Sequence, residues 1–530
     1  MTYRPAQSAK PSRRALALAW ALALLGGLAG CAAFPGINWW FLAPVSAGLL
    51  FTVAELLGPW RGFGAAVGYG LVMFLPLIWW AHVAAGTLPW LALAAASAFF
   101  LGLAVPAYGY ATRLLGSTSY LIKALLFALL FTAADTFRGV FPFGGFPWER
   151  FGFSQADSPL GRWGWVGGAT LIAFTTAATG ALLAGAIRHL RARRWRWAGG
   201  GVAAAVALLA VPLVFPLGTG EQAGTIDIVA VQGNVAVTEE GLFAHQREVL
   251  QNHVNGTLKL AQAGERPDVV LWPENATDID PNTDQAAADA IDGAAQAIGA
   301  PILVGSIEYT DTGQRYNLGV LWEPGVGITD TYAKQHPAPF AEYIPARGFF
   351  RLFTKKVDLI AHDMLPGSKV GVIDLPVERL GRSVTMGDVI CFEVADDAIV
   401  TQSVKAGAEF LVIQTNNASF GDTAESLQQL AMSRLRAIEH GRAVVQISTV
   451  GVSAVIAPDG TVLQQTGLFE AAEMVATLPL RTSLTPAAYL APVLSWAFPL
   501  AGAALWLAGI GAAVAALAAR RRRSRTGDAP

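Results

Sequence analysis

Long apolar stretches separated by short polar loops make up the first two fifths of the chain and return near its end. They cover residues 14–35, 39–57, 63–82, 88–111, 119–137, 163–187, 198–217 and 489–519. About 20 apolar residues in helical conformation cross the hydrocarbon core of a bilayer. The pattern therefore predicts a multi-pass α-helical membrane domain of about eight spans.

The pattern differs between residues 218 and 488. Short β-rich runs at 226–234, 268–275, 301–309, 383–394 and 408–417 alternate with helical stretches at 239–262, 283–298 and 424–440. Apolar strands separated by helices are typical of sheets buried on both faces. We expect an α/β domain of layered α–β–β–α type. The domain boundaries that follow are 1–217 for seven spans, 218–488 for this domain, 489–519 for the eighth span and 520–530 for a basic tail.

Charge is scarce and unevenly placed. Only 14% of residues are charged, whereas soluble proteins carry about a quarter. Basic residues cluster before the first span, between the sixth and seventh spans at 188–196, and after the eighth at 520–523. The positive-inside rule then places both termini in the cytoplasm and residues 218–488 on the outer face of the plasma membrane. Arg138 and Arg150 are exceptions. A nucleic-acid partner is not expected, because no folded domain carries a basic face.

Two local features leave alternatives open. Leu28-Ala29-Gly30-Cys31 after basic and apolar residues imitates a lipoprotein signal peptide, but further apolar segments favour a first transmembrane helix. The aromatic, Gly- and Pro-rich segment 141–153 is too irregular for a helix, so it lies at the outer interface or re-enters among the helices. The only two cysteines, Cys31 and Cys391, exclude a disulfide framework. No metal or nucleotide motif is present, so we expect neither a metal nor a cofactor.

Three segments place reactive side chains next to predicted strands. They are Trp272-Pro273-Glu274-Asn275, Tyr332-Ala333-Lys334-Gln335-His336 after a predicted hairpin at Pro324 and Gly325, and Val389-Ile390-Cys391-Phe392-Glu393. Each has an ordinary explanation on its own: a helix-capping carboxylate, a solvated lysine and a buried structural cysteine. Strand ends, however, are where α/β proteins gather active sites.

Together the three residue types can catalyse acyl transfer. A thiol is mostly protonated near neutral pH, and a neighbouring carboxylate can remove its proton. The thiolate attacks an ester or amide carbonyl, and a lysine ammonium stabilises the charge that grows on oxygen. Loss of the leaving group gives a thioester, which a second nucleophile resolves.

The order Glu–Lys–Cys with its flanking residues resembles the nitrilase superfamily. The resemblance implies that Glu274 is the general base, Lys334 the oxyanion stabiliser and Cys391 the nucleophile, with Glu342 and Glu393 in support. The eight spans, with stretches such as Phe146-Pro147-Trp148 and Val231-Gln232-Gly233-Asn234, resemble the membrane-embedded branch, the apolipoprotein N-acyltransferases. This implies transfer of a fatty acyl chain from a membrane phospholipid to the α-amino group of a diacylglyceryl-cysteine at a lipoprotein N-terminus.

Aromatic residues are the candidates for contact with lipid. Trp148, Phe392 and Phe420 belong to family-like stretches, although Phe392 stands where tyrosine is common and Ser419 where tryptophan is common. Phe349, Phe350 and Phe353 lie beside basic residues in the segment 346–364, which suits a mobile lid at a membrane surface. The alternative is that these aromatics pack on the α/β core.

Two other functions remain open from the residues alone. A membrane-tethered amidase or nitrilase-like hydrolase would use water as the second nucleophile, although one span would suffice to anchor it. A catalytically inactive membrane scaffold would not need Glu274, Lys334 and Cys391 together. We expect a monomer whose partners are a phospholipid, a lipoprotein and the bilayer.

Overall fold

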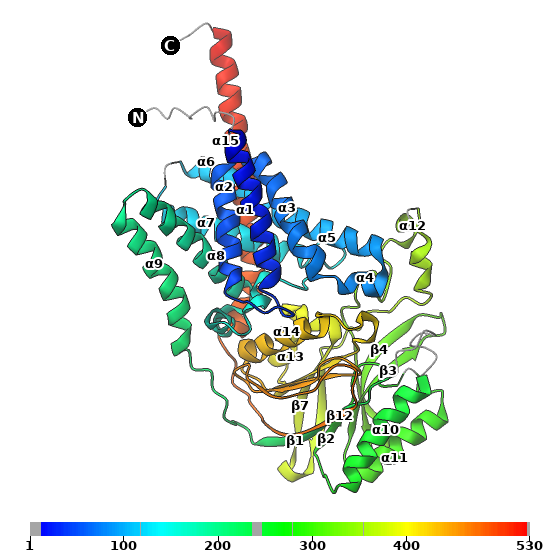
Figure 1. Cartoon of the computed structure of the whole chain (residues 1–530). Coiled ribbons are helices and arrows are strands. Elements are labelled where there is room, and N and C mark those ends of the chain that lie inside the picture. The colour runs from blue at the N-terminus through cyan, green and yellow to red at the C-terminus, as the bar shows by residue number, and fades with distance from the viewer. Residues whose placement is uncertain (1–11, 117, 236–245, 278, 353, 527–530) are drawn as a thin grey trace.

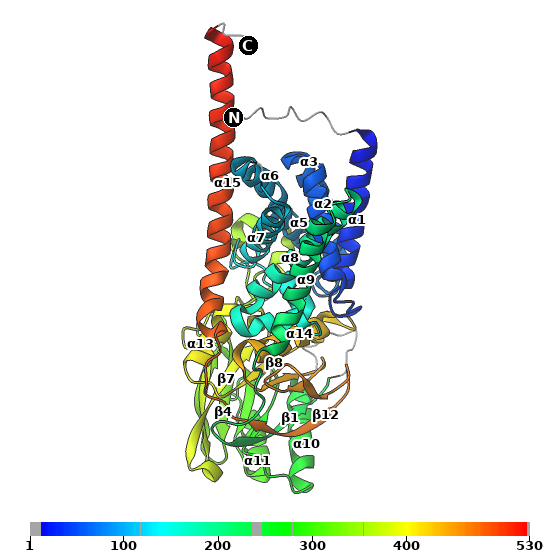
Figure 2. The same cartoon turned by 90° about the vertical axis from the view of Figure 1, so that its left-hand side faces the viewer.

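A helical bundle and a two-sheet domain lie end to end in the computed structural model of this chain (Figure 1 and Figure 2). The structure describes residues 12–116, 118–235, 246–277, 279–352 and 354–526. The bundle contains α1 (Arg13–Ala32), α2 (Leu42–Leu56), α3 (Pro59–Leu77), α4 (Trp80–Ala85), α5 (Thr87–Gly102), α6 (Ala104–Leu115), α7 (Tyr120–Arg138), α8 (Gly164–Arg191), α9 (Trp195–Ala210) and the long α15 (Ala487–Thr526).

Each predicted span contains a helix, but not every helix is long and apolar enough to cross a bilayer. Six helical segments among the described residues are long and apolar enough: Arg13–Ala32, Thr87–Leu115, Tyr120–Arg138, Pro159–Arg191, Trp195–Val214 and Ala487–Ala519. The second predicted span is the shorter apolar helix α2. The third is divided between α3 and α4, and Arg61 and four glycines of α3 lower its hydropathy. The described part of the chain therefore has six candidate spans, as expected of a multi-pass membrane protein.

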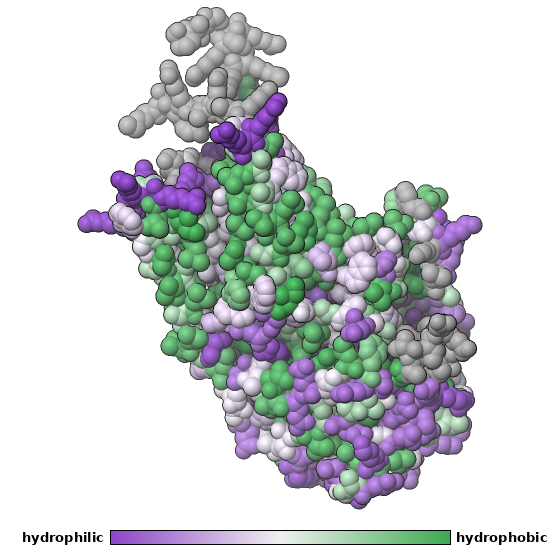
Figure 3. All heavy atoms as spheres, in the orientation of Figure 1, coloured by the Kyte–Doolittle hydropathy of each residue, from purple (hydrophilic) through white to green (hydrophobic). Residues whose placement is uncertain are grey.

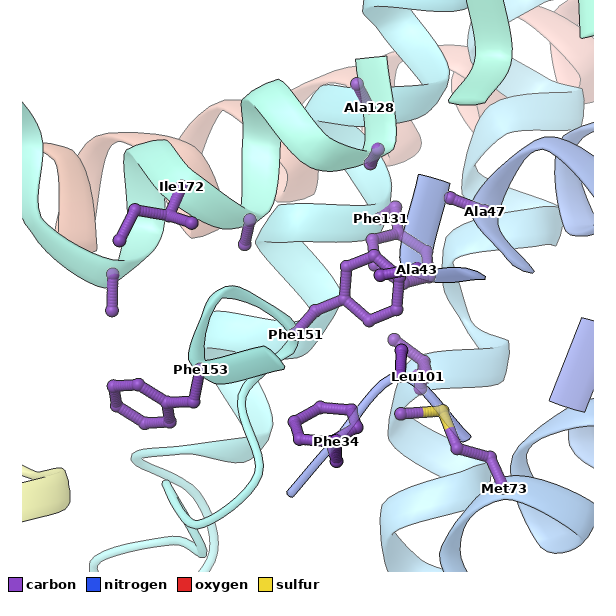
Figure 4. Packing of buried hydrophobic residues seen from close by; sticks show 14 of the residues in the cluster. Phe34, Ala43, Ala47, Met73, Leu101, Ala128, Phe131, Phe151, Phe153 and Ile172 are labelled. Carbon is purple, nitrogen blue, oxygen red and sulfur yellow. The ribbon is translucent and has the colours of Figure 1, made fainter. Parts of the chain in front are cut away.

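The irregular segment at 141–153 lies between the bundle and the sheets. It leads into two short 3-10 helices, η1 (Phe151–Gln155) and η2 (Pro159–Trp163). The aromatic side chains of its second half, Trp148, Phe151 and Phe153, are buried, whereas Phe141 and Phe143 of its first half are exposed. Figure 4 shows the Phe151 ring directed at Phe131 of α7, with ring centroids 4.9 Å apart. The prediction that this segment is too irregular for a helix is confirmed for residues 141–150, whereas 151–153 form the start of η1.

The domain beyond the bundle is an α–β–β–α sandwich. One six-stranded sheet of the described chain has the order β12-β1-β2-β3-β4-β5, and the other has the order β11-β10-β9-β8-β7-β6. The strands are β1 (Thr225–Gln232), β2 (Val269–Leu271), β3 (Ile302–Tyr309), β4 (Arg315–Glu323), β5 (Gly327–Ala333), β6 (Val372–Val377), β7 (Arg382–Ile390), β8 (Phe410–Thr415), β9 (Val444–Ser448), β10 (Ala454–Ile456), β11 (Val462–Gln465) and β12 (Ala472–Pro479).

Parallel strands form the centre of each sheet, and antiparallel strands form its edges. β1, β2 and β3 are parallel, as are β7, β8 and β9. The predicted hairpin at Pro324 and Gly325 joins β4 to β5. Buried apolar side chains such as Ile228, Met386 and Val445 fill the space between the sheets. The layered prediction is therefore confirmed.

Helices cover both outer faces of the sandwich. The first sheet is covered by α10 (Gln246–Gln262) and α11 (Gln285–Ile298), and the second by α13 (Asp397–Lys405) and α14 (Glu425–His440). Part of the predicted helix 239–262 lies outside the described residues. Short elements complete the domain: α12 (Arg347–Phe350), η5 (Lys355–Leu359), η6 (Glu378–Leu380), η7 (Cys391–Ala395) and η8 (Ala418–Phe420), whereas η3 (Val211–Val214) continues α9 of the bundle. The layer of α13 and α14 also faces the bundle (Figure 1).

The surface changes character along the length of the molecule. Hydrophobic residues cover much of the helical bundle, whereas hydrophilic residues gather over the far end of the sandwich (Figure 3). The N-terminal end of α1, the connection between α8 and α9, and the C-terminal end of α15 all lie at the opposite pole (Figure 1). The predicted basic clusters therefore gather at the end of the bundle that is away from the sandwich.

A buried network of charges joins the bundle to the sandwich. Arg150 donates to Asp397 of α13 at 2.7 Å, and Arg436 of α14 contacts the other oxygen of the same carboxylate at 2.8 Å. Arg436 also pairs with Glu439, and Ser495 of α15 donates to Asp397 at 3.1 Å. These pairs explain why Arg150 departs from the charge pattern of the loops. The two arginines hold the pKa of Asp397 below its ordinary value, against the effect of burial.

We expect Asp397→Ala to destabilise the protein by about 3–5 kcal/mol, because it leaves two buried arginines without their shared partner. Thermal unfolding of the purified protein in detergent measures the effect as a lower midpoint. Asp311→Ala, at an exposed aspartate of the sandwich, is the matched control and should unfold with the parent. An equal midpoint for both variants would mean that the network does not hold the two parts together.

Candidate active site

The two sheets bring the three predicted residues together from separate strand ends. Glu274 lies three residues beyond β2, and Lys334 directly follows β5 of the same sheet. Cys391 directly follows β7 of the other sheet and begins η7. Cys391 has a φ of +54°, in the left-handed region that non-glycine residues seldom occupy. Such a conformation costs about 1–3 kcal/mol and is a frequent property of functional turns.

Lys334 is a buried cation held between two carboxylates. Its side chain nitrogen lies 2.8 Å from Glu342 and 3.2 Å from Glu274, and the residue is only 1% exposed. Burial opposes the charge, but the two carboxylates outweigh it and raise the pKa of Lys334 above its ordinary value. The second oxygen of Glu342 accepts from the backbone N–H of Ala338 at 2.6 Å. The ammonium is therefore charged and fixed in position.

Glu274 is held at both carboxylate oxygens. Oε1 accepts from the side chain of Asn317 at 2.6 Å and from Lys334 at 3.2 Å. Oε2 accepts from the backbone N–H of Asn416 at 2.9 Å, and the residue is 4% exposed. The carboxylate has little freedom to turn away from the site.

The thiol of Cys391 is supplied to this group by the other sheet. Thr415 and Gln429 contact its sulfur at 3.5 Å and 3.8 Å. Burial and the negative charge of Glu274 raise the pKa of the thiol well above its ordinary value, and Lys334 only partly offsets them. The resting thiol is thus protonated beside a carboxylate that can accept its proton.

Glu393 joins the lysine strand to the cysteine turn. Its carboxylate accepts from the backbone N–H groups of Gln335 and His336, from that of Ile390, and from the hydroxyl of Tyr332. Burial raises its pKa, although these hydrogen bonds oppose the shift. The residue contacts backbone on both sides of the site, so it fixes the spacing between Lys334 and Cys391.

Aromatic rings connect the cysteine turn to the bundle. Phe392 stacks on Trp148 with centroids 6.0 Å apart and an interplanar angle of 3°. Trp80, at the start of α4, meets Trp148 at 5.7 Å and Phe420 at 5.1 Å. The indole N–H groups of both tryptophans donate to Gln428 of α14. This aromatic wall (Trp80, Trp148, Phe392 and Phe420) includes the residue that directly follows the candidate nucleophile in the chain.

The other predicted aromatics lie apart from this wall. Phe350 of α12 packs against Phe340 at 4.9 Å and against Phe143 of the irregular segment at 5.9 Å. Phe349 is 57% exposed, and Phe353 lies outside the described residues. The arm that carries α12 reaches the level of α4 and α5 (Figure 1). Its described aromatics therefore contact the membrane-proximal segment and not the sandwich core.

Several polar residues of the site were missed by the sequence analysis. Thr415 and Gln429 contact the sulfur, and buried Glu425 accepts from Asn417 at 2.7 Å. Burial and the negative charge of Glu274 raise the pKa of Glu425 to about 8, against the hydrogen bond from Asn417. The helical pattern located α14 but gave no sign that its polar side chains are buried.

The described residues do not suggest a metal site. No group of three or more His, Cys, Asp or Glu side chains among them is arranged to hold an ion. Cys31 of α1 and Cys391 are both free thiols in the described chain.

Comparison with solved structures finds proteins that are similar to about half of this chain. One is a variant of the amidase from Nesterenkonia sp. AN1, 16% identical, covering 52% of this chain and 95% of that chain with a TM-score of 0.36. Another is Nit3 from Saccharomyces cerevisiae, a member of branch 10 of the nitrilase superfamily, 15% identical, covering 52% and 94% with a TM-score of 0.37.

Comparison of sequences covers most of the chain. The model of the apolipoprotein N-acyltransferase N-terminal domain matches residues 26–182, and that of the carbon-nitrogen hydrolases matches residues 230–484. The apolipoprotein N-acyltransferase of Mycolicibacterium smegmatis is 38% identical over 92% of this chain and 84% of its own length. That of Pseudomonas putida is 30% identical over 91% and 94%. The chain therefore belongs to the apolipoprotein N-acyltransferase family.

Proposed function

We propose that this apolipoprotein N-acyltransferase works through a thioester on Cys391. The donor is a membrane phospholipid, and the acceptor is the α-amino group of the S-diacylglyceryl-cysteine at a lipoprotein N-terminus. The observation that carries the proposal is the buried ammonium of Lys334 between Glu274 and Glu342, together with a cysteine in a strained turn. No cofactor is required by this chemistry.

The first half-reaction transfers the acyl group to sulfur. Glu274 takes the proton of Cys391, and the electron pair left on sulfur attacks the ester carbonyl carbon. The carbonyl oxygen becomes negative and is stabilised by Lys334. When the tetrahedral intermediate collapses, the C–O bond to the glycerol breaks, and Glu274 returns the proton to the departing oxygen. The products are a Cys391 thioester and a lysophospholipid.

Charge conservation explains why the lysine is placed between two carboxylates. Before attack, the site holds the anions Glu274 and Glu342, the cation Lys334 and a neutral thiol. After attack Glu274 is neutral, and the negative charge has moved to the substrate oxygen. Lys334 keeps two anionic partners throughout, with Glu342 constant and the oxyanion in place of Glu274. The buried charge is never left unpaired, which would be costly.

The second half-reaction transfers the acyl group to nitrogen. Glu274 takes a proton from the acceptor amine as it attacks the thioester carbonyl, the C–S bond breaks, and the proton passes to the leaving sulfur of Cys391. Water would give hydrolysis instead, so the acyl site must be dry. Trp148, Phe392 and Phe420 line this site in the proposal and contact the acyl chain.

The topology follows from the same proposal. Residues 1–217 and 489–519 form the membrane domain with eight membrane-inserted segments, residues 218–488 form the outer catalytic domain, and 520–530 form a cytoplasmic tail. Support comes from the basic clusters, which lie at the pole away from the sandwich. In this proposal the sandwich lies on the outer face of the plasma membrane.

Cys391→Ser is expected to abolish both acyl transfer and lysophospholipid release, because the acyl-enzyme no longer forms. Mass spectrometry after incubation with phospholipid alone should find the acyl adduct on Cys391 of the parent and none on the variant. Cys31→Ala, which removes the other cysteine, should retain the adduct. Turnover of Cys391→Ser at a near-parental rate would exclude Cys391 as the nucleophile.

Glu274→Gln should block acylation of Cys391, and Lys334→Met should slow it by about 10²–10³-fold, as expected for a lost oxyanion donor. Single-turnover thioester formation measures both rates. The losses should not add in the double variant, because the residues act as one unit. The surface pair Lys259–Glu473, 2.8 Å apart, offers the matched control: Lys259→Met and Glu473→Gln should acylate normally. Normal acylation in both Glu274→Gln and Lys334→Met would show that these two residues have only a structural role.

The segment 346–364 is proposed to be a lid that opens toward the bilayer. A genetically encoded environment-sensitive fluorescent residue at Phe350, in protein reconstituted in liposomes, should report a lipid-like environment that changes when substrate binds. The same residue at exposed Val326, in the β4–β5 turn, should report water in both states. A protein-buried signal at Phe350 that is indifferent to lipid would rule out the lid.

A further inference from the structure

A chain of hydrogen bonds runs through the interior of the sandwich and ends on the sulfur of Cys391. The backbone N–H of Gly451 donates to Ser448 Oγ at 2.8 Å, and Ser448 donates to Asn417 Oδ1 at 2.6 Å. Asn417 Nδ2 donates to Gln429 Oε1 at 2.9 Å, and Gln429 Nε2 lies 3.8 Å from Cys391 Sγ. Gln429 lies in α14, Ser448 ends β9, and Asn417 and Gly451 lie in the loops after β8 and β9, so the tertiary fold assembles these hydrogen bonds.

The direction of this chain is fixed at its far end. A backbone N–H can only donate, so the Ser448 oxygen accepts from Gly451, and the acceptor within reach of the Ser448 proton is Asn417 Oδ1. This sets the Asn417 amide with its NH₂ toward Gln429, and Glu425 accepts from the same NH₂ at 2.7 Å. The side-chain oxygen of Gln429 then accepts a hydrogen bond from the NH₂ of Asn417 and another from the hydroxyl of Thr415 at 2.8 Å. Only the NH₂ of Gln429 remains to face the sulfur.

Burial prevents the amides from turning over. Ser448 and Gln429 are fully buried, and Asn417 is 3% exposed. A flip of Gln429 would direct its NH₂ at the NH₂ of Asn417, which cannot accept, and buried groups without partners cost about 1–3 kcal/mol each. Gly451 is required for the close approach, because a Cβ there would lie 2.1 Å from Asn417 Oδ1.

We infer that Gln429 is a further residue of the acyl-transfer site, a pre-oriented N–H donor to the Cys391 thiolate. The inference rests on the proposed function, in which Cys391 is the nucleophile. When Glu274 takes the thiol proton, the electron pair stays on sulfur, and the N–H of Gln429 is already directed at it. The donor favours the thiolate and holds Sγ in position for attack.

A neutral donor suits the charges that face this sulfur. The negative charges of Glu274 and Glu425 oppose ionisation of the Cys391 thiol, and the positive charge of Lys334 favours it. In the proposed reaction Lys334 is committed to the substrate oxygen, and a second cation would compete with it for that oxygen. An amide stabilises the thiolate without adding charge to the site.

The test measures the thiol directly, in the full-length protein in detergent with Cys31→Ala as the parent. The rate of alkylation of Cys391 by iodoacetamide is followed against pH by mass spectrometry of the Cys391 peptide. In Gln429→Met, which keeps the length of the side chain but removes the donor, the apparent pKa of alkylation should rise by about one unit or more. Below the parental pKa, that shift corresponds to an alkylation rate at least about 10-fold lower.

A matched control separates this effect from general damage. Gln446 is also a fully buried glutamine, bonded to Ser433 and to the carbonyl of Val452, and it has no recorded bond to Cys391. Gln446→Met should leave the alkylation profile at that of the parent. Ser448→Ala, a small change at the far end of the chain, should shift the profile in the same direction as Gln429→Met but by less.

Two results would overturn the inference. One is a parental profile in folded Gln429→Met, and the other is an equal shift in Gln446→Met. If Gln429→Met does not fold, the test rests on Ser448→Ala. A parental alkylation profile in Ser448→Ala would show that the chain of hydrogen bonds does not affect the thiol. Failure of the proposed function is seen separately: transfer that survives Cys391→Ser would exclude the nucleophile whatever the alkylation profile shows.

Discussion

The rest of the site depends on one buried cation. Lys334 has almost no access to water, so its ammonium is stable only while carboxylates surround it. Glu274 and Glu342 satisfy that need, and each is in turn fixed by other donors, from Asn416 and Asn317 on one side and from Ala338 on the other. A candidate base and a candidate oxyanion donor are thereby held in one rigid group. Displacing either carboxylate would leave a charge in the protein interior, so the group is stable only when complete.

Docking of the sandwich on the bundle determines what lies over this group. The α13 and α14 layer covers one sheet and also faces the membrane helices, so its charged residues lie in a sealed interface. Arg150, Asp397 and Arg436 satisfy one another there. The same interface brings Trp148 from the bundle side against Phe392 beside the candidate nucleophile. An apolar wall next to a thiol is what a lipid acyl chain would need, and it is built only when both parts of the chain are in place.

Much of this arrangement could be predicted from residue patterns, and the failures share a physical cause. Apolar length located the helices, and the ends of apolar runs located Glu274, Lys334 and Cys391. Hydropathy did not show that α2 is a shorter helix or that the third apolar stretch is broken between α3 and α4. Gln429 and Glu425 were missed because helical periodicity assigns polar residues to water. In α14 nearly every side chain is buried, since one face meets a sheet and the other meets the bundle.

The buried polar network and the reactive thiol are two consequences of the same dry environment. Removing water from around Cys391 raises its pKa and so makes the resting thiol less nucleophilic. Dryness is nevertheless required in the proposed reaction, because a thioester exposed to water would be lost to hydrolysis. The reactivity of the thiol must therefore depend on oriented protein groups, because solvent is not there to stabilise the charges. Glu274 can take the proton, Lys334 can stabilise the oxyanion, and an amide whose direction is set from Gly451 faces the sulfur. Each is fixed before the substrate arrives, so little reorganisation is needed when charge moves.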